Sequence, residues 1–234
     1  MFNSFQNIFS AAPVPQKNCF EQNKNERVPN EMKKPIETSD CYKIVMVLDE
    51  SGSMNNIRSQ MIKAINDLIE EQKTVKDRPC KFTLVKFNNT ISPIVKNLDL
   101  QEVSLLNMSD YTPNAMTALN DAIGHTINWF RYETNVLLVI ITDGQENSSS
   151  DYKHNDIMKM LDEKQKHRDW SYVYLCNDLT TSVQGNNLGL KTSKYTTNVM
   201  CEQACYGDYI SKNLNEAIKT CRKTGMSVQS QLNN

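Results

Sequence analysis

The sequence predicts an α/β fold, in which helices cover both faces of a doubly wound, mostly parallel central sheet. Short runs rich in Val, Ile and Leu recur along the chain, and such runs are typical of parallel strands buried on both faces. Segments with apolar residues at helical spacing separate these runs, an alternation that favours a parallel sheet. One tight turn signal, Asn88-Asn89, joins two strand-like runs and predicts a single antiparallel strand at the sheet edge.

The first elements begin just after residue 40. Residues 42–48 form an apolar run with β-branched side chains, which predicts a buried strand. An amphipathic helix is expected over residues 55–74, because apolar side chains recur there at every third or fourth position. Residues 81–87 predict a second strand, and residues 90–95 follow the turn as its hairpin partner.

The second half of the chain continues the alternation of helix and strand. The pattern predicts, in order, a helix at 119–130, a strand at 135–142, a helix at 152–168, a strand at 170–176 and a helix at 205–223. Residues 178–200 are expected to form a loop, because they contain glycines and many Asn and Thr side chains. The predicted arrangement is Rossmann-like.

Composition divides the chain into three parts. Residues 1–40 are rich in Asn, Gln, Lys, Glu and Pro, and such a segment buries too little apolar surface to offset the entropy of ordering. They are therefore predicted to form a flexible N-terminal arm. The alternating region predicts one domain over residues 41–225, and residues 226–234 are expected to form a short C-terminal tail.

Charge and composition argue against several classes of function. The formal net charge is -1 at pH 7 and the pI is about 6.3, which gives no electrostatic basis for binding nucleic acid or an anionic membrane. No apolar run approaches the roughly 20 residues of a membrane-spanning helix, and the N-terminus lacks the features of a secretory signal. The seven cysteines are irregularly spaced, which favours reduced thiols. We expect a cytoplasmic location, or a virion if a virus encodes the chain.

Polar residues that suit a divalent cation follow two of the predicted strands. The first strand leads directly into Asp49, Ser51 and Ser53, and the strand before residue 143 leads into Asp143, which precedes a glycine. Thr117 stands where a loop turns into a helix. Ligands bind at the carboxyl ends of strands in open α/β sheets, and carboxylate and hydroxyl oxygens suit Mg²⁺. The alternative is that Asp49, Ser51 or Ser53 merely caps a helix.

The same residues resemble the metal-ion-dependent adhesion site (MIDAS) of von Willebrand factor A domains. The resemblance covers roughly residues 41 to 223. It is closest to the standalone bacterial and phage proteins of this family, which share three short sequence motifs with the chain. In this sequence the motifs run from Leu48 to Met54, from Thr117 to Gly124 and from Ile140 to Asn147.

The resemblance implies a role for each residue. Ser51, Ser53 and Thr117 would bind the ion directly through their hydroxyls, while Asp49 and Asp143 would hold metal-bound waters and orient the hydroxyls. Three neutral ligands leave the charge of a divalent ion poorly balanced, so a carboxylate of a partner would complete the coordination. The implied cofactor is Mg²⁺, with Mn²⁺ or Ca²⁺ as alternatives, and the implied partner is a protein that presents Asp or Glu.

One departure from the family pattern precedes Thr117. Many relatives have Gly-Thr or Gly-Gly there, and this chain has Ala115-Met116. Glycine lets the backbone turn freely, so its loss is expected to restrict movement of the loop at 111–117 more than metal binding itself.

Other polar residues near the strand ends have competing interpretations. Glu146, Asn177 and Asp178 follow predicted strands and are candidate contacts to a partner, and solvated loop positions explain them as well. Glu50 is interpreted as a solvated residue, and Asp121 as a surface charge in the first turn of a helix.

The sequence favours a metal-dependent protein-binding module over two other classes of protein. The first is a structural component of a larger assembly, for example in a virus or phage, which would tolerate a chelator or Ser53→Ala. The second is a metal-dependent hydrolase, which needs a nucleophile or base near the ion. A haloacid-dehalogenase-type phosphatase would require an acid at position 51, where this chain has Ser51. The chain also lacks the Gly-rich phosphate loops and the Gly-x-Ser-x-Gly elbow, so we expect no enzymatic activity.

Overall fold

A six-stranded sheet with the strand order β3-β2-β1-β4-β5-β6 forms the centre of the domain. The computed structural model of the chain describes residues 41–166, 170–193, 196–225 and 227–232, so the predicted arm at 1–40 lies outside the described residues. The strands are β1 (Tyr42–Asp49), β2 (Cys80–Phe87), β3 (Ile91–Asp99), β4 (Val136–Ile141), β5 (Trp170–Cys176) and β6 (Thr196–Met200). All neighbouring pairs are parallel except β2 and β3, which confirms the predicted sheet with one antiparallel edge strand.

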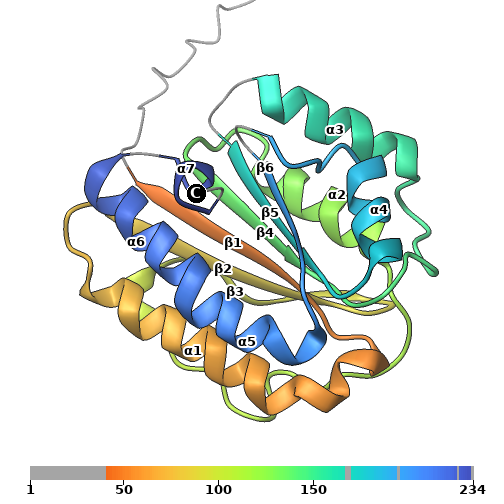
Figure 1. Ribbon diagram of the computed structural model, residues 1–234, viewed down its shortest axis with the longest axis horizontal. Helices are drawn as coiled ribbons and strands as arrows, with labels where there is room; N and C mark the ends of the chain where they lie inside the picture. Colours follow the sequence, from red (N-terminus) through yellow and green to blue (C-terminus); the bar gives the residue numbers. More distant parts are fainter. Residues whose placement is uncertain (1–40, 167–169, 194–195, 226, 233–234) are drawn as a thin grey trace, which may run out of the picture. The chain divides into compact units, whose positions relative to one another are not determined.

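Helices cover both faces of this sheet (Figure 1), as predicted. One face carries α1 (Arg58–Thr74), α5 (Tyr206–Asp208) and α6 (Asn215–Thr224), and the other carries α2 (Leu119–Trp129), α3 (His154–Lys166) and α4 (Leu179–Asn187). Successive side chains of a strand point to opposite faces. Ile44 and Met46 of β1 therefore join the apolar cluster under α1, whereas Val45 and Val47 join the cluster under α2 and α3. Both clusters hold β1 in place.

The segment at 178–200 was expected to be a loop, and this prediction is wrong. It contains α4 and the parallel edge strand β6. Asp178 caps α4, because its carboxylate accepts the backbone N–H of Thr181. Gly185 lets this helix approach the sheet, since a Cβ there would lie 2.6 Å from the ring of Tyr174. Neither element has the apolar periodicity that marks the others, and tertiary packing decides their structure.

The helix predicted at 205–223 is broken into successive turns of different pitch. A 3₁₀ turn, η3 (Gln203–Cys205), leads into α5, and a π-helical segment, η4 (Tyr209–Leu214), joins α5 to α6. Gly225 ends α6 with a left-handed φ of 73°. After it, the short helix α7 (Gln229–Leu232) follows Val228, which is buried in the cluster under α1. The described part of the expected C-terminal tail thus packs onto the domain.

Two 3₁₀ helices connect the strands and helices of the first half of the domain. A 3₁₀ helix, η1 (Gly52–Ile57), precedes α1, and η2 (Leu100–Glu102) follows β3. None of the described helices combines the length and apolar character needed to cross a bilayer. Within the same residues, the cysteines form no disulfide.

Candidate metal-binding site

The candidate site lies at the carboxyl ends of β1 and β4, the two central strands. These strands pair in parallel register up to Leu48 and Ile141, so the residues that follow them emerge side by side. Thr142 and Asp49 meet directly, because the Thr142 hydroxyl donates to Asp49 Oδ2 at 2.7 Å. The fold therefore brings the two acid-bearing loops together at one edge of the sheet, as the sequence predicts.

Asp49 is fully buried beneath these loops. Its second oxygen, Oδ1, accepts the backbone N–H of Ser51 at 2.7 Å, so both carboxylate oxygens have a donor. Burial raises the pKa of Asp49 to about 6, and the hydrogen bonds from Thr142 and Ser51 oppose that rise. Ser51 occupies the N-cap position of η1, but its hydroxyl makes no capping hydrogen bond. The Ser51 side chain therefore does not act as a helix cap.

A chain of hydrogen bonds links the two serines to the second acid. Ser51 Oγ lies 3.1 Å from Ser53 Oγ, and the Ser53 hydroxyl donates to Asp143 Oδ1 at 2.6 Å. Asp143 is half-buried, and burial raises its pKa while the hydrogen bond from Ser53 lowers it. Because the Ser53 proton goes to Asp143, Ser53 Oγ accepts from the Ser51 hydroxyl with one lone pair and keeps the other available for another partner.

Thr117 is held against the same cluster from a third loop. Its backbone N–H donates to Asn147 Oδ1 at 2.9 Å, and the backbone N–H of Asn147 donates to Thr117 O at 3.0 Å. Gly144 makes room for the Thr117 side chain, since a Cβ on this glycine would lie 2.7 Å from Thr117 Oγ1 and 3.4 Å from Asp49 Oδ2. All five residues predicted to bind the metal therefore lie in one cluster at this edge of the sheet.

Two buried tyrosines support the strand ends from below. The Tyr111 hydroxyl donates to the backbone carbonyl of Asp49 at 2.6 Å, and the Tyr206 hydroxyl donates to that of Thr142 at 2.9 Å. Each bond satisfies a backbone carbonyl at the point where its strand ends. Both tyrosines belong to the apolar cluster under α1, so the two strand ends are held from the same face of the sheet.

The residues in this cluster fit a divalent cation. They offer carboxylate and hydroxyl oxygens, which are the ligands that Mg²⁺ prefers. The side chains that hydrogen-bond to Asp49 and Asp143 are all neutral, so a cation would supply the balancing positive charge. In the part of the chain that the structure describes, no group of three or more His, Cys, Asp or Glu residues forms a competing metal site.

The backbone of the loop before Thr117 is strained at Ala115. Ala115 has a φ of 63°, in the left-handed region that disfavours side chains. Its carbonyl nevertheless accepts the N–H of Gly52 at 3.2 Å, and the N–H of Met116 donates to Asn89 Oδ1 at 2.7 Å. These two bonds tie the strained loop to its neighbours.

Replacing Ala115 with glycine is expected to stabilise the domain by about 1 kcal/mol, because glycine adopts this φ without the clash of a Cβ. The greater freedom of glycine in the unfolded chain removes part of that gain. Urea unfolding in the presence of a chelator measures the change. Unaltered or lower stability would show that the bonds around Ala115 relieve the strain.

The three residues proposed as partner contacts have different environments. Glu146 is half-buried, and its carboxylate accepts the backbone N–H groups of Asn120, Ser148 and Ser149. These bonds fold the loop around Glu146 and join it to the start of α2. Asn177 is half-buried and accepts the Thr181 hydroxyl. Asp178 is exposed beside the site, and its capping bond from Thr181 lowers its pKa. Asp178 is thus the most accessible of the three.

Two acids that were interpreted as solvated are buried. Glu50 accepts the ammonium group of Lys86 at 3.0 Å and the backbone N–H of Thr112 at 2.6 Å, which fixes the start of the loop before Thr117. Asp121 accepts the backbone N–H groups of residues 150, 151 and 152. Asp121 lies in the first turn of α2, as predicted, but neither acid is solvated, because their donors lie far away in the sequence.

Among the residues that sequence reasoning missed, Gln203 contacts both a serine and an acid of the site. The side-chain amide of Gln203, in η3, donates to Asp143 Oδ2 at 2.6 Å and to the backbone carbonyl of Ser53 at 3.0 Å. No local pattern marks Gln203, because it lies 60 residues after Asp143 and joins no motif.

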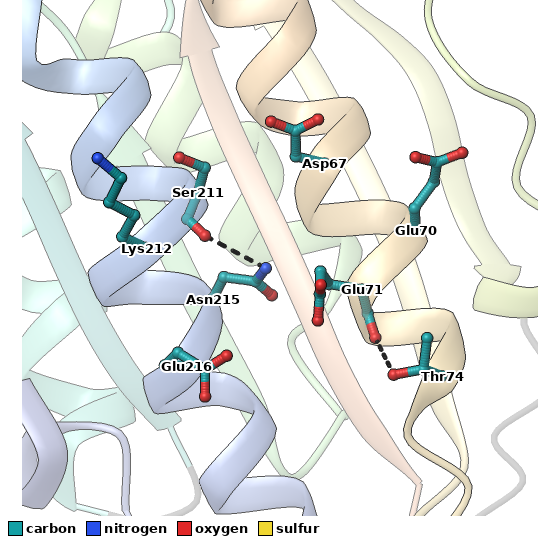
Figure 2. A pocket seen from close by; sticks show the side chains of 8 residues that line it. All are labelled: Asp67, Glu70, Glu71, Thr74, Ser211, Lys212, Asn215 and Glu216. Carbon is teal, nitrogen blue, oxygen red and sulfur yellow. Dashed lines mark hydrogen bonds between the residues drawn. The ribbon is translucent and has the colours of Figure 1, made fainter.

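A separate cleft of about 520 Å³ lies between α1 and the η4–α6 segment (Figure 2). Its lining is mostly acidic and polar, and the residues are Asp67, Glu70, Glu71, Thr74, Ser211, Lys212, Asn215 and Glu216. It shares no residue with the candidate site, so the two features are independent.

Solved structures of other proteins share this fold. Proximal thread matrix protein 1 (PTMP1) from the mussel byssus is 18% identical with a TM-score of 0.54, over 79% of this chain and 47% of that chain. A von Willebrand factor type A structure from Catenulispora acidiphila is 13% identical with a TM-score of 0.52, over 78% and 42% of the two chains. The PilB minor pilin from Streptococcus sanguinis is 14% identical with a TM-score of 0.52, over 79% and 63%. Such low identities show the fold alone.

The chain spans about half the length of PTMP1, which has also been solved with a zinc-occupied MIDAS motif. No curated protein matches the chain. The model of the von Willebrand factor type A domain matches residues 43–197, which is more than half of the 234 residues. The chain therefore belongs to the von Willebrand factor type A domain family.

Proposed function

We propose that this domain is a metal-dependent protein-binding module. Asp49, Ser51, Ser53, Thr117 and Asp143 would hold a divalent cation, and the cation would bind an Asp or Glu side chain of a protein partner. The observation that carries the proposal is the hydrogen-bond chain from Ser51 through Ser53 to Asp143, beside the buried Asp49. Mg²⁺ is the proposed ion, and Mn²⁺ and Ca²⁺ accept the same oxygen ligands.

The family and the surface around the site support a protein partner. Domains of this family are generally interaction modules without catalytic activity. Met116, Leu179 and Met200 expose apolar side chains in the loop before Thr117 and at the ends of β5 and β6. Exposed apolar side chains beside a polar centre are typical of protein interfaces.

Removing the Ser53 hydroxyl is expected to weaken Mg²⁺ binding about 10-fold or more, because one ligand and the donor to Asp143 are lost together. Calorimetric titration of Mg²⁺ and Mn²⁺ into the chelator-stripped full chain measures this effect. Ser59→Ala is the matched control, since Ser59 is exposed on α1 away from the site. Equal affinities in the wild type and Ser53→Ala, or an absence of binding in the wild type, would contradict the proposal.

The partner is sought by capture on the immobilised chain, with Mg²⁺ or with a chelator. A captured protein that is released by chelator, and lost when one of its acids is changed to the amide, supports recognition through the ion. Association that survives both the chelator and Ser53→Ala would instead favour a structural component of a larger assembly.

A further inference from the structure

We propose that Gln203 is a positioning residue of the metal site, which orients Asp143 so that the Ser53 oxygen faces the cation. This inference rests on the proposed function and extends it to a residue outside the family motif. Gln203 lies in η3, the turn between β6 and α5. Its side-chain amide reaches the site from there.

The contacts of Gln203 close a ring of three hydrogen bonds. Gln203 Nε2 donates to Asp143 Oδ2 at 2.6 Å, and the Ser53 hydroxyl donates to Asp143 Oδ1 at 2.6 Å. The same Nε2 donates to the backbone carbonyl of Ser53 at 3.0 Å. With one oxygen held by the amide, Asp143 presents the other to Ser53. The Ser53 proton is thereby directed to Asp143, so Ser53 Oγ accepts from Ser51 and keeps one lone pair free.

The backbone around Gln203 is anchored, so the amide has little freedom to leave. Gln60 of α1 donates to the carbonyl of Ala204 at 2.6 Å. Three residues after Gln203, the buried Tyr206 donates to the carbonyl of Thr142, next to Asp143. One tether thus runs to α1 and the other to the end of β4. Such support on both sides is what a side chain needs in order to fix the geometry of another.

An amide is chemically suited to this position. It donates N–H groups without carrying a positive charge, whereas Lys or Arg would pair with Asp143 and repel a cation. A hydrogen bond from a neutral donor keeps the carboxylate in place without neutralising its negative charge, which can then attract the cation. Gln203 is therefore suited to orienting an acid whose charge must stay available.

Gln203→Met is the variant that tests the inference, because methionine keeps the length of the side chain and removes the donor. Gln203 is half-buried between the exposed residues Glu202 and Ala204, so the variant is expected to fold. Titration of Mg²⁺ into the chelator-stripped full chain is expected to show affinity about 10-fold weaker than wild type. Gln101→Met is the matched control, since Gln101 is an exposed glutamine whose amide also donates to a backbone carbonyl, and its affinity should equal that of wild type.

A second measurement separates orientation of Asp143 from a general loss of stability. In metal-free protein, the shifts in unfolding midpoint caused by Gln203→Met and Asp143→Asn are expected to be non-additive, because the two side chains share one bond. Additive shifts, or wild-type Mg²⁺ affinity in Gln203→Met, overturn the inference while leaving the metal site intact. A wild type that binds no Mg²⁺ or Mn²⁺ overturns the proposed function, and the inference with it.

Discussion

Gly144→Ala is expected to abolish measurable Mg²⁺ binding while the domain remains folded. The added Cβ would lie 2.7 Å from Thr117 Oγ1, closer than carbon and oxygen can approach without displacement. Thr117 has little room to yield, since it is buried, its β-branched side chain is stiff, and Asn147 clamps its backbone. The methyl group therefore occupies the place of the hydroxyl, and we expect a loss of affinity of about 100-fold. Calorimetric titration measures it.

Gly52→Ala is the matched control for this substitution. Gly52 also lies in a site loop, but a Cβ there has only Ala115 O within 4 Å, at an ordinary 3.8 Å. Its φ is also outside the left-handed region. We expect Gly52→Ala to bind Mg²⁺ within about twofold of wild type. If Gly144→Ala bound the ion as tightly as Gly52→Ala, the placement of Thr117 against Gly144 would be wrong.

Arg222→Met is expected to lower the free energy of unfolding by about 3 kcal/mol or more. Arg222 is buried on α6, and its guanidinium donates to the backbone carbonyls of Gln72, Val75 and Arg78. These carbonyls lie in the last turn of α1 and just beyond its end, where the helix dipole is negative. Methionine fills much of the space but removes the guanidinium donor from all three carbonyls.

Urea unfolding compares Arg222→Met with Lys223→Met, the neighbouring exposed position on α6. The control is expected to lie within about 0.5 kcal/mol of wild type. Arg222→Lys should also be destabilised, because an ammonium group lacks the planar fork that reaches several carbonyls at once. A loss no larger in Arg222→Met than in Lys223→Met would show that packing alone, without the charged donors, holds α6 against α1.

The central features of the fold and site could be predicted from local patterns. Asp49 and Asp143 each follow a continuous apolar strand, and parallel strands end at one edge, so their proximity followed from the sequence alone. Thr117 could be placed only through a family motif, since no strand leads into it. The hydrogen bonds that join Ser53 to Asp143 span 90 residues and required the structure.

The failed predictions share one physical cause. The strand β6 reads Thr-Thr-Asn-Val-Met, which carries no clear alternation, and α4 contains few apolar residues. Pairing with β5 and packing of Gly185 on Tyr174 decide their structure. Glu50 resembled a solvated acid for the same reason, because its donors Lys86 and Thr112 are distant in the chain. Long-range contacts leave no local signal.

The order of the strands separates the residues for metal binding from the exposed side chains available to a partner. Asp49 ends β1 and Asp143 follows β4, the central pair, whereas Leu179 follows β5 and Met200 ends β6 at the periphery. Both of these outer side chains are exposed, so substitutions there disturb few buried contacts. A library of variants restricted to these outer positions should therefore yield new binding specificities on an unchanged ion-binding centre. The same division would let descendants of one ancestral domain change partners while they keep the same metal-binding residues.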